Sequence, residues 1–215
     1  MNSQPNFNLI ARPYRWLEYL TLGPILQNCR THFLPLLLDR KQALVLGDGD
    51  GRFLAKLLTR NPTLQADAVD TSATMLRLLR NRCEAATLTT TTRLRTHNRS
   101  ALDHSPSAKT DLITAHFFFD CLPQQDLDTL IVRIAPHTSP NTLWLISDFR
   151  IPSGPMSLPA KLYIRSLYLA FCLLTGLRTT HLPDHEIPLR RAGLTRTHQR
   201  LFLFGLLTTE IWSRL

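Results

Sequence analysis

The pattern of apolar and polar residues divides the chain into a central part and two flanks. Between residues 43 and 149, short apolar runs alternate with longer segments in which apolar residues recur every three or four positions. The short runs predict buried strands, and the longer segments predict helices. The threonine-rich segment 87–98 predicts an edge strand. Strands that alternate with helices are typical of a parallel sheet covered on both faces, so we expect an α/β core over residues 41–150.

The flanking segments have different patterns. Residues 6–38 show helical spacing and predict two or three short helices. A long apolar helix is expected over 158–177 and a short one over 187–193. Alternating residues from 195 to 215 then predict an antiparallel hairpin. No linker divides the chain, so we expect one domain, 1–215, in three parts: 1–40, 41–150 and 151–215.

Composition narrows the function only slightly. The formal net charge is +9, and 21 of the 25 basic residues are arginine. Such a chain could bind nucleic acid, an anionic membrane or an acidic substrate, and a solvated basic surface explains the charge equally well. The four cysteines lie far apart and no Cys/His cluster has zinc spacing, so no metal site is expected. The N-terminal stretch lacks the pattern of a secretory signal, and we expect a cytoplasmic protein.

A glycine-rich stretch follows the first predicted strand. Gly47, Gly49 and Gly51 alternate with two aspartates in "VLGDGDGRF", and a helix pattern comes next. Ligands of open parallel sheets bind at the carboxyl ends of the strands, and glycines let the backbone approach them closely. Asp70 ends the next strand, where an acid can accept hydrogen bonds from both ribose hydroxyls. Together these features indicate a ligand of the adenosine type.

The two aspartates of the loop distinguish between the ligands of this type. A dinucleotide places its pyrophosphate at the helix N-terminus, where Asp48 and Asp50 would repel it at a cost of about a few kcal/mol. The spacing also differs from G-x-G-x-x-G, because Arg52 stands where the third glycine belongs. S-adenosylmethionine (SAM) has no phosphate and carries two cationic groups. We therefore expect SAM rather than NAD, with at least one of the two aspartates near its methionine end.

With these motifs in this order, the chain resembles the class I SAM-dependent methyltransferases of the small-molecule type. The resemblance spans residues 40–150: "VLGDGDGRF" is similar to the first motif, "AVDTSATML" to the second and "DLITAHFFFDCLP" to the fourth. It implies a Rossmann-like open sheet of seven strands, mostly parallel with a C-terminal antiparallel hairpin. Helices would cover both faces, and residues 1–40 would form a lid. One departure is Val45, where the family usually carries an acid.

The resemblance also implies a set of site residues. The predicted cofactor-binding residues are Tyr14, Gly47, Asp48, Gly49, Gly51, Asp70, Thr71, Ser100 and Ala101. Asp103 is an alternative to the Ser100-Ala101 pair. At the end of the fourth strand, His116 and Asp120 occupy the place of a general base or substrate ligand, although a core histidine is an equally good interpretation of His116. Phe117, Phe118 and Phe119 follow the same strand, and alternation would bury at least one of them.

We expect methyl transfer to a small acceptor, aromatic or lipid-like, because the segment that would cover it, 158–192, is apolar. The helix 158–177 would cover the acceptor with Lys161 and Arg165 facing solvent, and a helix lying on a membrane surface stays open as the alternative. Another alternative is an RNA or protein methyltransferase that uses an arginine-rich band. The band comprises Arg77, Arg80, Arg82, Arg93, Arg95 and Arg99. Nucleic-acid methyltransferase signatures are absent, so nucleic acid is disfavoured. A non-catalytic SAM-fold binding protein is the remaining alternative.

Overall fold

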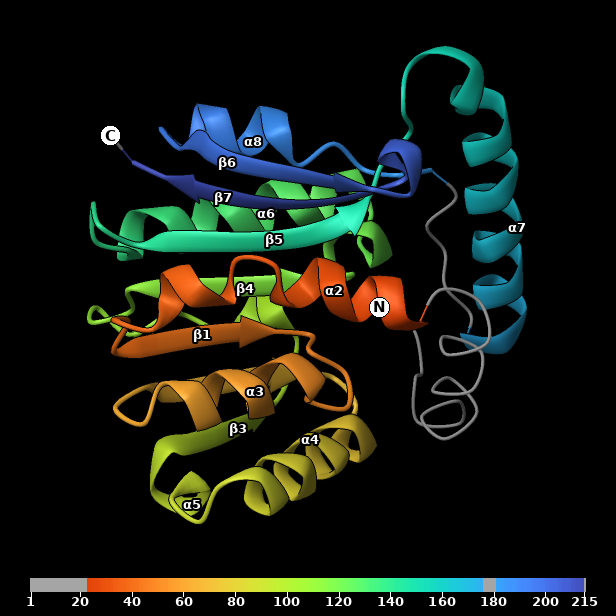
Figure 1. The fold of residues 1–215 in the computed structure, drawn as a ribbon. Coiled ribbons are helices and arrows are strands. Elements are labelled where there is room, and N and C mark those ends of the chain that lie inside the picture. Colours follow the sequence, from red (N-terminus) through yellow and green to blue (C-terminus); the bar gives the residue numbers. More distant parts are fainter. Residues whose placement is uncertain (1–22, 176–180, 215) are drawn as a thin grey trace.

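The computed structural model describes residues 23–175 and 181–214, which contain one seven-stranded sheet in the order β3-β2-β1-β4-β5-β7-β6 (Figure 1). The strands are β1 (Gln42–Leu46), β2 (Gln65–Asp70), β3 (Leu94–Asn98), β4 (Leu112–His116), β5 (Leu143–Phe149), β6 (Thr195–Phe202) and β7 (Leu207–Ser213). The first five strands are parallel, whereas β7 runs antiparallel to both β5 and β6. The predicted mostly parallel sheet with a C-terminal antiparallel hairpin is confirmed.

Helices cover both faces of this sheet. They are α2 (Gly23–Thr31), α3 (Arg52–Arg60), α4 (Ala73–Ala86), α5 (Thr90–Arg93), α6 (Gln124–Ile134), α7 (Ser157–Thr175) and α8 (Glu186–Arg191). Short 3₁₀ turns are η1 (Leu34–Leu37), η2 (Ala101–Asp103), η3 (Phe119–Cys121), η4 (Ala135–His137), η5 (Gly154–Met156) and η6 (Leu203–Gly205). Residues of η1, α3 and α4 pack on one face, and residues of α6 and α8 pack on the other. The predicted lid over residues 1–40, with Tyr14, lies mostly outside the described residues.

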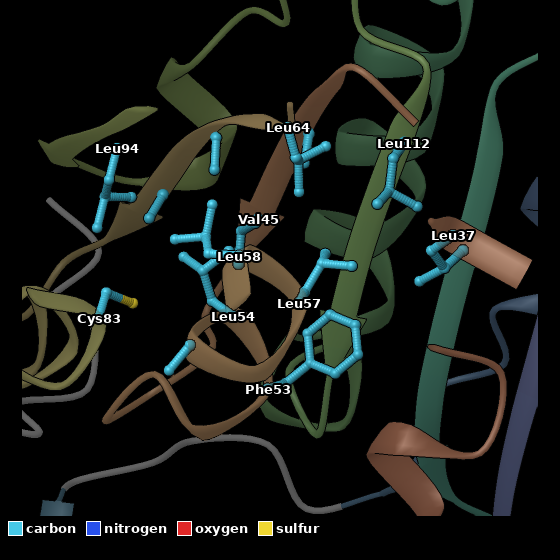
Figure 2. Packing of buried hydrophobic residues seen from close by; sticks show 14 of the residues in the cluster. Leu37, Val45, Phe53, Leu54, Leu57, Leu58, Leu64, Cys83, Leu94 and Leu112 are labelled. Atoms are coloured by element: carbon cyan, nitrogen blue, oxygen red, sulfur yellow. The ribbon is translucent and has the colours of Figure 1, made fainter. Parts of the chain in front are cut away.

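Strand β1 is buried on both sides, as expected for the centre of a parallel sheet. Its side chains alternate between the two cores, because successive residues of a strand point to opposite faces. Ala43 and Val45 belong to the core under α3 and α4, whereas Leu44 and Leu46 belong to the core under α6. Figure 2 shows Val45 beside Leu54 and Leu58 of α3. Val45, which stands where the family usually carries an acid, is therefore a packing residue of the core.

The segment 87–98 departs from the prediction. Only Leu94–Asn98 form a strand, and residues Thr90–Arg93 form the short helix α5. The Thr90 hydroxyl donates to the carbonyl oxygen of Cys83 at 2.8 Å. This hydrogen bond satisfies a carbonyl at the C-terminus of α4, and Thr90 does not join the sheet. Threonine side chains that bond nearby carbonyls compete with strand pairing, and this competition is why propensity misled here.

Candidate active site

The glycine loop connects β1 to α3 at the point where the strand order reverses, since β1 lies between β2 and β4. Gly47, Gly49 and Gly51 have φ angles of 59°, 58° and 79°, a region that favours glycine. A Cβ on Gly51 would lie 2.8 Å from the Cα of Leu79, so this glycine lets α4 pack closely on the loop. A Cβ on Gly49 would meet no atom of residues 23–175 and 181–214 within 4 Å. Gly49 is therefore the glycine with room for a ligand beside it.

Both aspartates of the loop contact groups of the chain itself. The Asp48 Oδ2 accepts a hydrogen bond from the Leu54 N–H of α3 at 3.0 Å, which satisfies one free donor in the first turn of that helix. The Asp50 carboxylate accepts from Arg82 Nη2 at 2.8 Å and lies 3.1 Å from Arg52 Nε. These contacts give the two acids a structural role. Their placement near the methionine end of SAM stays a prediction.

Asp70 ends β2 beside the glycine loop. Its Oδ1 accepts from the Ser72 N–H at 2.8 Å, and Ser72 in turn caps α4 by accepting from Met75 N–H, as the sequence predicts. Burial raises the pKa of Asp70 to about 6, against the lowering effect of its backbone donors at Thr71 and Ser72. A hydrogen-bond donor stabilises the ionised form of such a carboxyl group. The two hydroxyls of a ribose are donors of this kind.

The ends of β2 and β3 bring the remaining predicted cofactor residues to the same edge. Asn98 of β3 donates through Nδ2 to the Thr71 carbonyl oxygen at 2.9 Å, so the two strand ends are joined. Ser100 follows, and its Oγ accepts from Leu102 N–H at 3.1 Å to begin η2. Ala101 is buried and Asp103 is exposed. Except for Tyr14, the structure therefore gathers all predicted cofactor-binding residues at the carboxyl ends of β1, β2 and β3.

His116 ends β4, as predicted, but its side chain belongs to the core. It is 3% exposed, and its ring centroid lies 4.2 Å from that of Phe53. The imidazole Nδ1 lies 2.9 Å from Ser147 Oγ, which donates to Thr209 Oγ1 at 2.9 Å, so a polar row crosses β4, β5 and β7. Burial and, secondarily, the charge of Arg30 keep the pKa of His116 well below its usual value. A neutral, enclosed imidazole favours a positioning role, and the catalytic role of His116 stays a prediction.

The three phenylalanines after His116 divide between packing and the crevice. Phe119 is buried, in line with the expected alternation, and Phe118 packs so closely on Gly47 that it leaves no room for a Cβ there. Phe117 has a φ of 52°, a strained conformation for a residue with a side chain. The guanidinium carbon of Arg30 lies 5.0 Å from the centre of its ring. Such strain is often found at functional sites, and here it lies where β4 turns toward Asp120.

Two buried acids, Asp120 of η3 and Asp148 of β5, lie side by side at this end of the sheet. The Asp120 N–H donates to Asp148 Oδ2 at 3.2 Å, and Asp148 Oδ1 accepts from the Phe149 N–H. The Asp120 Oδ1 is buried and has no hydrogen-bond partner among the described residues. Burial raises the pKa of both carboxyls, and for Asp148 the charge of Asp120 adds to this effect. The pair therefore favours a state with a proton on one carboxyl.

Helix α7 covers this acid pair. Tyr168 donates its hydroxyl to the Asp120 carbonyl oxygen at 3.0 Å, and with Ile164 it packs against Cys121 and Phe149. Lys161 and Arg165 are exposed, as predicted for a helix that covers the strand ends with its other face. Within the described parts of the chain, no helix is both long and apolar enough to pass through a membrane. The sequence contains no signal for Tyr168 as a site residue. It places Asp148 near a strand end at the same edge of the sheet, where a surface cap or an ion pair is the expected role.

The arginine-rich band is largely part of the fold. Arg93 is buried and donates to the carbonyl oxygens of Leu58 and Asn61, at 3.1 Å in each case. Arg82 is paired with Asp50, and Arg95 lies 3.0 Å from the Asp67 carboxylate. Arg80 bonds the Thr96 hydroxyl. These arginines hold loops and strands together, so the structure offers little support for a band that binds nucleic acid.

Comparisons with known proteins agree with this geometry. The family described as "Methyltransferase domain" matches residues 44–143. No curated protein sequence matches the chain. Among solved structures, the mitomycin 7-O-methyltransferase MmcR superposes with a TM-score of 0.70 at 16% identity, over 98% of this chain and 61% of its own.

Two further structures have the same fold. The SAM-dependent methyltransferase SibL has a TM-score of 0.68 and 21% identity, over all of this chain and 63% of its own. The N-methyltransferase NodS from Bradyrhizobium japonicum has a TM-score of 0.61 and 15% identity, over 89% of this chain and 97% of its own. The chain thus spans less than two thirds of MmcR and SibL but nearly all of NodS.

The class of protein follows from fold, motif order and family match together. Residues 44–143 match the methyltransferase domain family, and the sheet order with its antiparallel hairpin is the Rossmann-like fold of these structures. The family match supports the interpretation of this region as a class I SAM-dependent methyltransferase domain. It extends over the glycine loop, Asp70 and the end of β4, all of which lie inside the matched region.

Proposed function

We propose that this protein transfers the methyl group of SAM to a small acceptor, aromatic or lipid-like, held between the carboxyl ends of β4 and β5 and helix α7. The observation that carries the proposal is the row of acids at three strand ends beside the glycine loop. Asp70, Asp120 and Asp148 all lie there, and burial raises the pKa of each. Three acids at neighbouring strand ends suit a cationic cofactor and disfavour a pyrophosphate.

The residues at the ends of β1 to β3 fit SAM. Asp70 would accept hydrogen bonds from the ribose hydroxyls, and Ser100-Ala101 lie where the adenine would rest. A Cβ on Gly49 would meet no described atom within 4 Å, so this glycine would allow close approach of the amino-acid part. When bound, SAM supplies a methyl group that its sulfonium already activates. The protein then has to align the acceptor and exclude water.

The acid pair is the best candidate for a general base. Asp120 has an unpartnered Oδ1, and the neighbouring Asp148 raises the cost of a second negative charge. A carboxylate with a raised pKa is better matched to taking a proton from an acceptor near neutral pH than an ordinary one. Tyr168 positions this pair, because its hydroxyl bonds the Asp120 backbone. The proton of an acceptor hydroxyl or amine would pass to Asp120 as the methyl group is transferred.

The acceptor belongs to the apolar side of the crevice. Cys121, Phe149 and Tyr163 pack against Ile164 and Tyr168 of α7, and Phe117 adjoins Phe149. The neighbours include an O-methyltransferase and an N-methyltransferase, so the likeness in fold leaves the methylated atom open.

A transfer assay tests the proposal. The protein is incubated with methyl-labelled SAM and a panel of hydroxylated aromatics, aromatic amines and polar lipids, and label in the product is measured. We expect label on at least one apolar acceptor. SAM binding without label on any member would contradict the acceptor class, whereas absence of SAM binding would contradict the function itself.

A further inference from the structure

Helix α7 has two faces of opposite character. Its inner face, Ala160, Ile164 and Tyr168, is buried over the strand ends. On its outer face Leu158, Leu162 and Leu169 are 66%, 61% and 62% exposed. Figure 1 shows this helix at the periphery of the molecule, beside the carboxyl ends of the strands. Covering the crevice accounts for the inner face and leaves the outer leucines unexplained.

The outer leucines form one continuous stripe with a cation in it. Positions 158, 162, 165 and 169 follow the spacing i, i+4, i+7 and i+11, which places them on one side of a helix. Arg165 therefore lies among the leucines, and Lys161 lies next to them. Both cations are exposed. No acidic residue occurs anywhere in Ser157–Thr175. We call Leu158, Lys161, Leu162, Arg165 and Leu169 the outer stripe.

A second exposed apolar group lies near α7. The turn between β6 and β7 presents Phe204, which is 83% exposed. Leu203 and Phe204 both have positive φ angles, 49° and 54°, although neither is glycine. Leu206 of the same turn packs against Ile164 and Tyr168, so the turn adjoins α7. Two strained residues in succession that leave a phenylalanine in solvent suggest that its exposure has a function.

We propose that the outer stripe, together with Phe204, docks this protein on the surface of an anionic membrane. An interfacial helix buries leucines at the boundary of headgroups and acyl chains, while lysine and arginine extend to the phosphates. The outer stripe has this composition, and the net charge of +9 favours an anionic surface. The helix would lie in the plane of the surface, because no described helix is suited to cross a membrane.

Charge argues against a second copy of the chain as the occupant. A two-fold interface brings the same surface of both copies together. The outer stripe would then place Lys161 and Arg165 of one copy against the same cations of the other, with no acid of α7 to compensate. Like charges brought together in this way oppose association. The docking proposal concerns a surface and does not depend on methyl transfer.

Flotation with vesicles tests the proposal. Vesicles of phosphatidylcholine alone are compared with vesicles that also contain phosphatidylserine. We expect binding to the anionic vesicles only, weakened by salt. The double variant Lys161→Glu/Arg165→Glu should lower this binding by about 30-fold or more, because each basic residue near the surface contributes roughly 1 kcal/mol. Leu162→Glu and Phe204→Ser should each weaken it by about tenfold through lost apolar contact.

The matched control is Val132→Glu on α6. Val132 is 65% exposed, like the leucines of α7, but it lies on a helix that covers one face of the sheet. This variant adds the same charge and should bind vesicles nearly as the original protein does. Equal losses for Val132→Glu and Leu162→Glu would overturn the proposal, as would absence of binding to anionic vesicles. A dimer that dissociates on Leu162→Glu, seen by light scattering, would assign the outer stripe to a second copy instead.

Discussion

Carboxylates at the ends of β1–β3 are held by donors within the chain, whereas two polar side chains at the ends of β4–β5 each have a buried atom with no partner among the described residues. Asp48 accepts from the first turn of α3, and Asp50 from Arg82. By contrast, Asp120 Oδ1 and His116 Nε2 are buried and lack a hydrogen-bond partner in the described part of the chain. Polar groups with hydrogen-bond partners inside the chain stabilise the structure of the loop. A buried polar group without a partner destabilises the fold unless a ligand forms the missing hydrogen bond. The comparison suggests that the chemistry lies on the β4–β5 side.

The largest expected effect concerns turnover. Asp120→Asn removes the proposed general base but keeps the shape of the side chain. Once an acceptor is known, kcat should fall by about 10²–10⁴-fold, while the affinity for SAM stays nearly unchanged. Steady-state kinetics and calorimetry measure the two quantities. An equal loss in both would mean that Asp120 supports the fold of the crevice instead of taking a proton.

The glycine loop offers a matched pair of substitutions. Gly51→Ala places a Cβ 2.8 Å from the Cα of Leu79 in a left-handed conformation, and should lower the free energy of unfolding by about 2–5 kcal/mol. Gly49→Ala has the same backbone strain but no neighbour within 4 Å, and should cost only about 1–2 kcal/mol. Denaturant unfolding measures both. If Gly49→Ala is the more destabilising change, Gly49 is packed and lacks the assigned room for a ligand.

The acid pair also predicts a gain in stability. Because burial raises the pKa of Asp120, the ionised form destabilises the folded protein at neutral pH, and this cost disappears as pH falls and the carboxyl is protonated. Asp120→Asn should therefore raise the free energy of unfolding by about 1–3 kcal/mol at neutral pH and bring little gain in acid. Asp103→Asn at an exposed position is the control. A loss of stability at neutral pH would contradict the assignment of a raised pKa.

A smaller effect concerns SAM affinity and pH. The pKa of Asp70 is raised to about 6 in the free protein, and hydroxyl donors from a ribose would lower it in the complex. The ionised form therefore binds better. Affinity should be complete above this pKa and fall about tenfold between about pH 7 and about pH 5. Asp70→Asn should remove this dependence, and a pH profile that survives in the variant would point to another titrating group.

Much of the fold could be predicted from the sequence because buried positions recur with the period of the strand or helix that contains them. Runs such as residues 43–46 and 144–146 are buried on both faces of the sheet, so they are continuously apolar. Asp70 and His116 could be placed at strand ends for the same reason. The segment 87–93 failed because threonine suits both a strand and side-chain bonds to carbonyls, and only the position of Cys83 decides between them.

The details of the site depend on contacts that sequence spacing does not encode. The bond from Tyr168 to Asp120 joins residues 48 positions apart, and it exists because α7 folds back over the strand ends. Whether Asp48 faces a ligand or the N-terminus of α3 depends on the dihedral angles of the loop. The arginine-rich band looked continuous in the sequence, but Arg93 is buried under backbone carbonyls while Arg95 lies at the surface.

The most direct test of the account is isothermal titration of SAM and NAD into the protein and into Asp70→Ala. We predict that SAM binds, that NAD does not, and that the substitution weakens SAM binding by about 1–3 kcal/mol, because two hydrogen bonds to a charged group are lost. Glu84→Ala, which removes an exposed acid of α4, should change the affinity much less. Tight binding of NAD without binding of SAM, or equal SAM affinity in the original protein and Asp70→Ala, would contradict the assignment of the crevice.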